Sequence, residues 1–429
     1  MEANMNDHHL SSTNNNNSHN SSTNNNNNSN NVEVLNEQLY KYIQDIKCID
    51  HHCHNILDEP GIFQLPLISS MCEANLEQDL NSLTFKRTLK ELSQLLSTST
   101  NNVEEIEKKR EELGVEQLTS ICFEKAKIEA IILDDAFEFK YNGKNLPMND
   151  WQWHTKYTKV YRVIRVETVV EKCIVQAKKD GSCWDKFLNH VVKELTIENN
   201  GVDGPENHRQ VIGYKSILAY RTGLKVDEWS LETVIQEYNT IQKELSPDVQ
   251  TYRLMSKPLI DFFLQLTMKI SAQHKPHPLP VQIHTGFGDS DVDLILANPL
   301  HLKPVIAAYP TVPITLLHCS YPYTREAAFL TWVYPNVYVD IGLAIPSLSI
   351  AGMRQALSSL LELAPIDKIL YSSDSHHIPE IYYLASHWSR TLLYQLFIES
   401  INQQEINHQE ATLFVDKIFR LNCLKLYNI

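Results

Sequence analysis

Four short apolar runs, spread over most of the chain, each end in side chains that bind metal ions. The runs are Ile49 to His54, Val281 to His284, Ile314 to His318 and Ile369 to Asp374. Side chains two apart on a strand share a face, so His52 and His54 are expected to point the same way. If the four runs are parallel strands of one barrel, their carboxyl ends meet at one mouth, where such barrels keep their chemistry. The pattern predicts a metal-dependent hydrolase or lyase.

The ends of the later strands carry the candidates for catalysis. Neutral imidazole is a good ligand for Zn²⁺, and His284 would add a third to the pair on the first strand. His318 is either a ligand or an unligated acid/base, and an unperturbed pKa near 6.5 suits both roles. Asp374 can bind the ion, take the proton of a bound water, or do both. The competing interpretation of Asp374 is a cap for the helix that follows it.

Basic residues near the same mouth would suit an acidic substrate. Lys215 ends a predicted strand and could bind a substrate carboxylate, bridge two metal ions as a carbamate, or be an exposed lysine with a buried stem. Arg165 and Arg221 could make bidentate contacts to carboxylates. An Arg165–Glu167 pair could equally be a structural salt bridge. His51 is expected to face the helices. Asp50, two residues before His52, is expected to face the barrel interior with it.

These residues require alternating strands and helices, and the apolar pattern predicts them. Eight strands are expected, and the order of runs and helical patterns predicts a (β/α)₈ barrel. The strand ranges are Ile46–Cys53, Ile128–Leu133, Val160–Val166, Val211–Ser216, Val281–His284, Pro313–His318, Val337–Ile341 and Ile369–Ser372. The helical ranges are Val34–Tyr42, Leu76–Glu112, Leu231–Leu245, Val249–Ala272, Ile381–Ile398 and Glu410–Leu424. The stretch Ala136–Lys159, with Trp151 and Trp153, is expected to be a loop insertion that covers the mouth.

Composition sets the remaining bounds. The chain has 429 residues, of which 43% are hydrophobic, enough for one barrel in residues 32–429. Residues 1–31 are rich in Asn, Ser and Thr, have little to bury, and are expected to be disordered. A formal charge of −14 argues against nucleic-acid binding. We expect a cytoplasmic protein with free thiols, since no apolar run suits a membrane span or a signal peptide and the eight cysteines show no paired spacing.

Other catalytic motifs are missing from the sequence. It contains no GxSxG elbow, no P-loop, no CxxC pair and no HExxH. Gly286-Phe287-Gly288 lacks the third glycine of a dinucleotide-binding turn.

The order HxH, lysine, His, His, Asp resembles the amidohydrolase superfamily, specifically its amidohydrolase-2 (amidohydrolase-related) branch and the nodulin/FluG-like group. The segments closest to that group are Gly213–Ser216, Ala219–Leu224, Val281–Gly288, Leu316–Tyr321, Tyr338–Gly342 and Tyr371–Glu380. The resemblance implies a (β/α)₈ barrel with a divalent metal, usually zinc. It implies His52, His54, His284 and Asp374 as ligands, and His318 as a ligand or a catalytic acid/base. Lys215 matches the position of the carbamylated lysine of binuclear members, where a carbamate would hold a second ion.

The reaction that the resemblance implies is hydrolysis of an amide bond by metal-activated water, with Asp374 as the proton acceptor and His318 polarising the carbonyl. Arg165, Lys215 and Arg221 would hold a small acidic substrate. Some relatives are fused to a glutamine-synthetase-like domain, which suggests an amide of glutamate. The alternatives are a non-oxidative decarboxylase of a carboxylated ring and a non-catalytic scaffold in development or signalling. Barrels of this kind often form dimers, so a homodimer is also expected.

Overall fold

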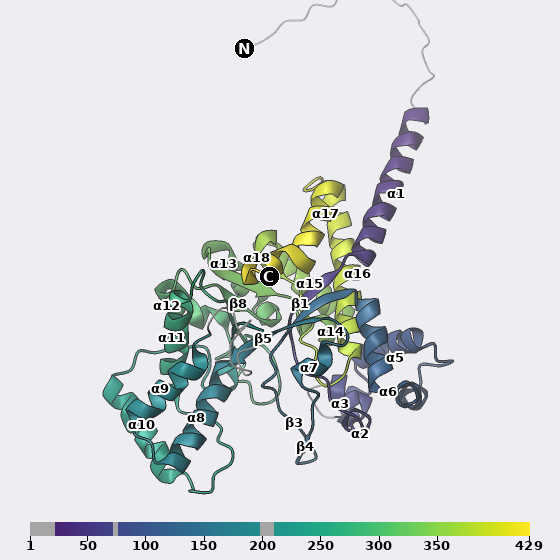
Figure 1. Ribbon diagram of the computed structural model, residues 1–429. Coiled ribbons are helices and arrows are strands. Elements are labelled where there is room, and N and C mark those ends of the chain that lie inside the picture. The colour runs from purple at the N-terminus through teal and green to yellow at the C-terminus, as the bar shows by residue number, and fades with distance from the viewer. Residues whose placement is uncertain (1–21, 72–75, 198–209) are drawn as a thin grey trace, which may run out of the picture.

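One parallel sheet of eight strands forms the centre of the molecule (Figure 1). The structure is a computed structural model that describes residues 22–71, 76–197 and 210–429. The strands of the sheet are β1 (Cys48–Cys53), β2 (Ile128–Leu133), β5 (Lys159–Arg165), β6 (Val211–Ser216), β7 (Val281–Ile283), β8 (Ile314–Leu316), β9 (Val337–Asp340) and β10 (Ile369–Leu370). Each strand pairs in parallel with the strand that follows it in this list. The predicted βα order is therefore confirmed.

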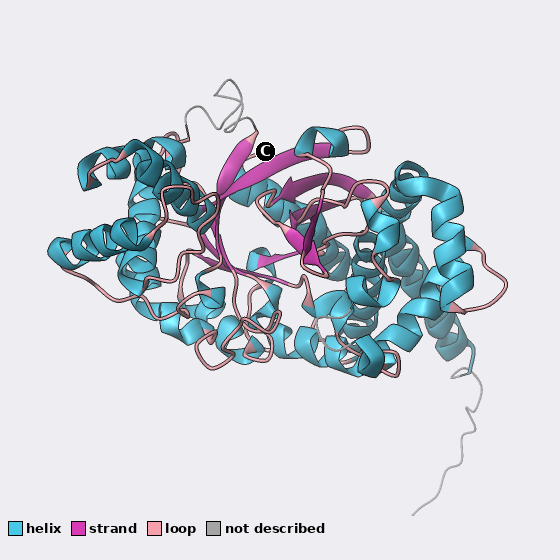
Figure 2. Ribbon diagram, turned by 90° about the horizontal axis from the view of Figure 1, so that it is seen from below, coloured by secondary structure: helices cyan, strands magenta, loops and turns pink. Residues whose placement is uncertain are grey.

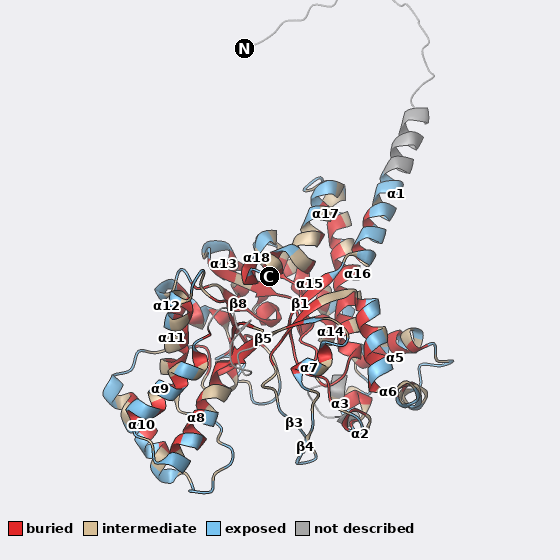
Figure 3. Cartoon of the chain, viewed as in Figure 1, coloured by how far each residue is buried: buried red, intermediate tan, exposed pale blue. Residues whose placement is uncertain are grey.

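The sheet closes on itself between its last and first strands. The backbone N–H of Asp374 donates to the carbonyl of His52 at 3.0 Å, and that of His54 donates to the carbonyl of Ser375 at 2.7 Å. These bonds join the segment after β10 to β1, and Figure 2 shows the strands enclosed by helices. The result is the expected (β/α)₈ barrel, and its buried residues occupy the strands and the inner faces of the helices (Figure 3).

Helices cover the outside of the barrel. The longer ones are α1 (Ser22–Asp45), α5 (Leu83–Leu96), α6 (Val103–Ala126), α8 (Val166–Asp180), α9 (Trp184–Leu195), α10 (Leu231–Glu244), α11 (Lys257–Gln273), α13 (Thr324–Val333), α15 (Ile350–Leu361), α16 (Glu380–Asn402) and α17 (His408–Asp416). The shorter ones are α2 (Gly61–Gln64), α3 (Leu67–Met71), α4 (Leu76–Asp79), α7 (Trp151–His154), α12 (Lys303–Ala308), α14 (Ala344–Ser347) and α18 (Asn422–Tyr427). Single turns occur at Leu218–Tyr220, Pro299–Leu302, His318–Ser320 and Ile366–Lys368, and a π-helical turn at Lys417–Leu421.

The strand boundaries fall close to the predicted ones, but several helix boundaries differ. The predicted helical stretch Leu76–Glu112 is divided among α4, α5 and the first part of α6, which continues to Ala126. Helix α11 begins at Lys257 rather than at Val249, because Pro258 fits only the first turn of a helix. The tail predicted to be disordered spans residues 1–31, and its first 21 residues lie outside the described residues. Helix α1 already begins at Ser22 and continues to Asp45, so residues 22–31 are part of it.

The insertion between β2 and β5 contains a hairpin that the sequence analysis missed. Strands β3 (Phe139–Tyr141) and β4 (Lys144–Leu146) pair antiparallel. They are joined by Asn142 and Gly143, whose φ values are 49° and 75°. Positive φ at both central residues is the requirement of a type I′ hairpin turn.

Two further expectations can be compared with the described residues. No helix in this part of the chain is long and apolar enough to span a membrane. Seven cysteines are free thiols, and the eighth, Cys72, lies outside the described residues.

A buried ion pair ties α16 to α6 and offers a test of the fold. Arg110 donates from Nε to Glu380, and both side chains are buried. Glu380→Gln leaves the guanidinium without its counter-charge, and removing one partner of a buried pair costs about 3–5 kcal/mol. We expect the urea midpoint of the variant to fall accordingly. Glu362→Gln, which breaks an exposed pair with Arg325, should shift the midpoint much less, because water screens charges at the surface. Equal shifts in the two variants would contradict this account.

Candidate metal centre

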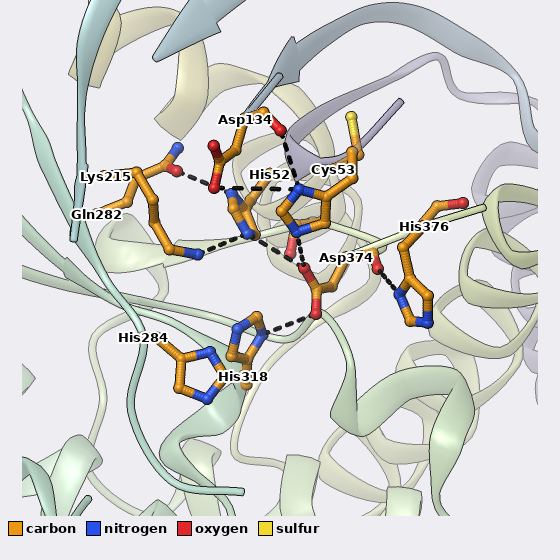
Figure 4. Close-up of polar contacts among 12 residues, drawn as sticks. His52, Cys53, Asp134, Lys215, Gln282, His284, His318, Asp374 and His376 are labelled. Atoms are coloured by element: carbon orange, nitrogen blue, oxygen red, sulfur yellow. Dashed lines mark hydrogen bonds and ion pairs between the residues drawn. The ribbon is translucent and has the colours of Figure 1, made fainter. Parts of the chain in front are cut away.

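Three side chains meet where β1 and β10 end. His52 lies in β1, His54 follows it directly, and Asp374 follows β10. Asp374 Oδ1 lies 3.1 Å from His52 Nε2 and 3.3 Å from His54 Nε2. All three residues are buried, and one ligand atom from each lies within 4.8 Å of the others. Figure 4 shows His52 and Asp374 pointing towards one another.

The protons on the two imidazoles are fixed by their other contacts. His52 Nδ1 lies 2.8 Å from Gln282 Oε1, which can only accept. His54 Nδ1 lies 3.0 Å from the backbone carbonyl oxygen of Asp134. Each Nδ1 therefore carries the proton, and each Nε2 presents a lone pair towards Asp374. Such outer contacts orient histidine ligands in metal sites.

The group fits a divalent cation. Asp374 Oδ1 is buried, and no donor among the described residues makes a hydrogen bond to it. Burial lowers the pKa of His52 to about 3, helped by the Lys215 ammonium, so its ring is neutral. Burial opposes ionisation of Asp374, but the pKa of that carboxyl is held well below its usual range, chiefly by His318. Two imidazole nitrogens and a carboxylate oxygen facing one another are a ligand set for zinc-like ions.

A β-bulge changes the expected orientation of β1. The register between β1 and β2 shifts between Asp50 and Cys53, so strict alternation fails there. His51 consequently faces the barrel interior, where its Nε2 lies 3.0 Å from Asp340 Oδ2. The expectation that His51 faces the helices is wrong. Asp50 accepts hydrogen bonds from the backbone and hydroxyl of Ser373, which helps to hold the β10 end against β1.

Lys215, on β6, contacts the group directly. Its Nζ lies 2.9 Å from His52 Nε2 and donates to that lone pair. Burial lowers the pKa of Lys215 to about 8, although Asp134 and Asp374 oppose the shift. A cation bound by His52 would displace this hydrogen bond and release Nζ towards the cavity that Lys215 lines. The alternative of an exposed lysine is wrong, because the residue is buried.

His318 and His284 lie beside the group but are not part of it. His318 Nδ1 lies 3.7 Å from Asp374 Oδ2, and neither ring nitrogen has a hydrogen-bond partner among the described residues. His284 donates from Nε2 to the carbonyl of Phe287 at 3.0 Å, so only its Nδ1 could bind a metal. Its ring lies 4.5 Å from that of His318, centroid to centroid. The structure places both residues at the predicted mouth, while their roles stay predictions.

The backbone is strained at two of these positions. His318 has a φ of 68° and Asp374 a φ of 50°, values that residues other than glycine rarely adopt. Asp340, on β9, accepts the backbone N–H of His318 at 2.5 Å and supports this turn. Strained non-glycine residues cluster at functional sites, where the surrounding structure holds them in place.

The mouth of the barrel forms a cavity of about 690 Å³. Its floor includes His54, Lys215, His284, His318 and Asp374. Aromatic side chains form part of its wall: Phe137, Phe139, Tyr220, His376 and His377. The insertion thus lines the mouth as predicted, but through Phe137 and Phe139. Trp151 and Trp153 pack with a hydrophobic cluster instead.

The predicted arginines differ in availability. Arg165 is held by Asp134, with Nε 3.0 Å and Nη2 2.6 Å from the same oxygen. The alternative Arg165–Glu167 pair is not found, and Glu167 accepts from the Ser216 hydroxyl. Arg221 lines the cavity and pairs with Glu171 through Nη2 at 3.2 Å. Its buried Nε has no hydrogen-bond partner among the described residues.

The sequence analysis gave no role to Gln282, Asp134, Asp340 or Phe137. Gln282 could have been found from its strand, since it shares the inward face with His284. Phe137 could have been found from the Asn142-Gly143 hairpin signal. Asp134 follows one predicted strand and Asp340 lies within another, but nothing in the sequence shows which histidine or arginine each one contacts.

A closed parallel barrel with a histidine, histidine and aspartate group at the carboxyl ends of its strands is the arrangement that the resemblance to the amidohydrolase superfamily implies. The family model described as amidohydrolase matches residues 261–429. Together with the relatives below, this match confirms the resemblance to the amidohydrolase-2 branch.

Three relatives illustrate the similarity. The protein fluG of Emericella nidulans is 29% identical over 419 residues, which cover 90% of this chain and 46% of that protein. The chain thus spans about half the length of this curated relative. A Lactobacillus casei structure, assigned as a metal-dependent hydrolase, is 25% identical with a TM-score of 0.76, covering 91% of this chain and 97% of that one. A uronate isomerase from Thermotoga maritima is 13% identical with a TM-score of 0.64, covering 92% and 97%, and shares the fold.

Proposed function

We propose that the chain is a metal-dependent hydrolase that cleaves the C–N bond of a small acidic amide, with one zinc ion. The observation that supports this most strongly is the convergence of three buried ligand atoms, His52 Nε2, His54 Nε2 and Asp374 Oδ1. The family match and the Lactobacillus casei neighbour agree with a metal-dependent hydrolase.

The residues around the site suit hydrolysis. A divalent cation in such a site polarises a carbonyl group and lowers the pKa of a water molecule. Asp374 Oδ2 faces His318 rather than the two ligand nitrogens, so it is the atom that accepts the proton of the water. The same oxygen then returns the proton to the leaving amine nitrogen. His318, with both nitrogens unpartnered among the described residues, donates a hydrogen bond to the substrate carbonyl.

Arg221 and Lys215 are the side chains that we propose bind the acidic part of the substrate. Arg221 has a buried Nε with no hydrogen bond among the described residues, and Lys215 Nζ is released when His52 binds a cation. Arg165 is less suited, because Asp134 already holds its guanidinium. An amide of glutamate, such as a γ-glutamyl amide, carries the required carboxylate.

One observation favours a second candidate, a non-oxidative decarboxylase. Phe137 lies 4.9 Å from the His54 ring and Phe139 lies 3.7 Å from the His377 ring, centroid to centroid. Both phenylalanines line the cavity. Flat aromatic walls of this kind suit a carboxylated ring, since stacked rings attract one another.

Isotopic water separates the two reactions. Zinc-loaded protein would be given γ-glutamyl anilides and carboxylated phenols in H₂¹⁸O and, separately, in D₂O. Hydrolysis places one ¹⁸O in the released carboxylate, whereas decarboxylation places one deuterium on the ring carbon and releases CO₂. We expect the first outcome. Ring deuteration without ¹⁸O in a carboxylate would replace the hydrolase proposal with the decarboxylase. A wild-type protein that binds no metal would favour the scaffold.

Arg221→Met tests the acidic-substrate proposal. Removing a hydrogen-bonded charge costs about 1.5–3 kcal/mol, so we expect KM for an acidic amide to rise by about 10- to 100-fold with kcat less affected. The matched control is Arg253→Met, which lines the same cavity but is exposed and paired with Asp291. Its KM should change less than about fivefold. Steady-state kinetics on both variants would contradict the proposal if Arg253→Met had the larger effect.

Three further expectations are carried as proposals. A second ion would require carbamylation of Lys215, whose Nζ lies beside His52. The other two are a homodimer and a cytoplasmic location. Gel filtration with light scattering would test the homodimer, and fractionation of cells would test the location.

A further inference from the structure

The end of the chain fills the end of the barrel opposite the metal centre. Cys423, Leu426 and Tyr427 of α18 form one buried cluster with residues from β1, β2, β5, β6 and β10: Ile49, Ala130, Ile132, Val163, Ile212 and Leu370. A Cβ atom on Gly213 of β6 would lie 2.8 Å from the carbonyl oxygen of Pro280, too close for an ordinary contact, and 3.4 Å from the Tyr427 ring. Figure 1 shows the C-terminus in the middle of the barrel end, away from the β3–β4 hairpin.

The hydroxyl of Tyr427 belongs to a hydrogen-bond chain that reaches a metal ligand. Gln282 Nε2 donates to Tyr427 Oη at 2.8 Å and to the carbonyl of His51 at 2.7 Å. Gln282 Oε1 then accepts from His52 Nδ1 at 2.8 Å. The opposite orientation of the amide would set its oxygen against the His51 carbonyl oxygen, which is repulsive.

Asp340 anchors the other end of this hydrogen-bond series. Tyr427 Oη lies 3.4 Å from His51 Nδ1, and His51 Nε2 lies 3.0 Å from Asp340 Oδ2. Because the carboxylate accepts, His51 Nε2 carries the proton and its Nδ1 accepts from the Tyr427 hydroxyl. Every donor in the series therefore points from the metal side towards Asp340. A directed chain of this kind polarises and strengthens its own bonds.

We infer that Tyr427 is a positioning residue for the metal centre: its hydroxyl fixes the Gln282 amide, which keeps the proton on His52 Nδ1 and leaves Nε2 free to bind a cation. The inference rests on the metal part of the proposed function and is independent of the substrate. It gives a residue of helix α18 a role in metal binding.

Zinc affinity tests the inference, measured by competition with a chromophoric chelator on metal-free protein, together with the visible spectrum of the cobalt-loaded form. We expect Tyr427→Phe to bind zinc about 10- to 100-fold more weakly, the range for losing an outer contact of a histidine ligand. The cobalt spectrum should also shift, because the ring of His52 is less well held. The benzene ring of the phenylalanine still fills the plug.

The matched control is Tyr214→Phe. Tyr214 is also fully buried, and its hydroxyl makes one hydrogen bond, to the carbonyl of Leu195 at 2.7 Å. This variant should lose similar thermal stability and bind zinc within about twofold of wild type, since its hydroxyl has no link to the ligands.

A double-mutant cycle with Gln282→Leu decides whether Tyr427 acts through the amide. We expect the double variant to bind zinc no more weakly than Gln282→Leu alone. Wild-type affinity in Tyr427→Phe, equal losses in the two tyrosine variants, or additive losses in the cycle would each overturn the inference and leave the proposed function standing. A wild-type protein that binds no zinc would overturn both.

Discussion

Asp374→Asn is expected to lose both metal and activity. The carboxylate is the one anionic member of the ligand group, with Oδ1 at 3.1 Å and 3.3 Å from the two imidazole nitrogens. An amide at this position supplies no charge and cannot accept the proton of a water molecule. We expect zinc affinity to fall by more than about 100-fold, which exceeds the loss expected when only a hydrogen-bond partner of a ligand is removed. Turnover at saturating zinc should fall by a further factor of about 10²–10⁴.

Elemental analysis after dialysis and rate measurements at high zinc would check both parts. Asp289→Asn is the matched control, because Asp289 lines the same cavity but lies outside the ligand group. It should keep wild-type metal content. An Asp374→Asn variant that retains one metal ion per chain with wild-type affinity would remove this residue from the centre.

His318→Asn is expected to separate chemistry from metal binding. Its ring lies 3.7 Å from Asp374 Oδ2 and outside the group of three, so metal content should stay at the wild-type level. Loss of a general acid/base or of its hydrogen bond to the substrate carbonyl lowers kcat by about 10²–10⁴. Metal analysis and turnover on the same sample would check this.

His387→Asn is the control for His318→Asn, because His387 lies on α16 against Tyr383 and Trp388. It should leave both quantities unchanged. If His318→Asn instead loses its metal, His318 is a fourth ligand, which was the other role predicted from the sequence.

The strands and the mouth could be predicted because their signal is local and periodic. Buried parallel strands are short apolar runs, and the side chain that ends each run lies at the carboxyl edge whatever the details of packing. That reasoning placed His52, His54, His318 and Asp374 together from separate parts of the sequence. Their mutual distances follow from barrel closure, which no single segment encodes.

The failures have physical causes in particular residues. His51 was placed on the wrong face because a bulge, which the sequence does not mark, breaks the alternation of β1. The ion-pair partner of Arg165 was also missed: the sequence analysis considered Glu167, whereas the guanidinium pairs with Asp134 at the end of the neighbouring strand. Which charges pair across strands depends on register, and register is a property of the folded sheet.

Anomalous diffraction from crystals of zinc-loaded protein tests the central claim most directly. Data collected on both sides of the zinc absorption edge locate the ion without assumptions about activity or substrate. We predict one peak at bonding distance, about 2.0–2.2 Å, from His52 Nε2, His54 Nε2 and an oxygen of Asp374. A zinc-containing crystal with its peak elsewhere, such as beside His376 and His377, would contradict the account of this barrel mouth.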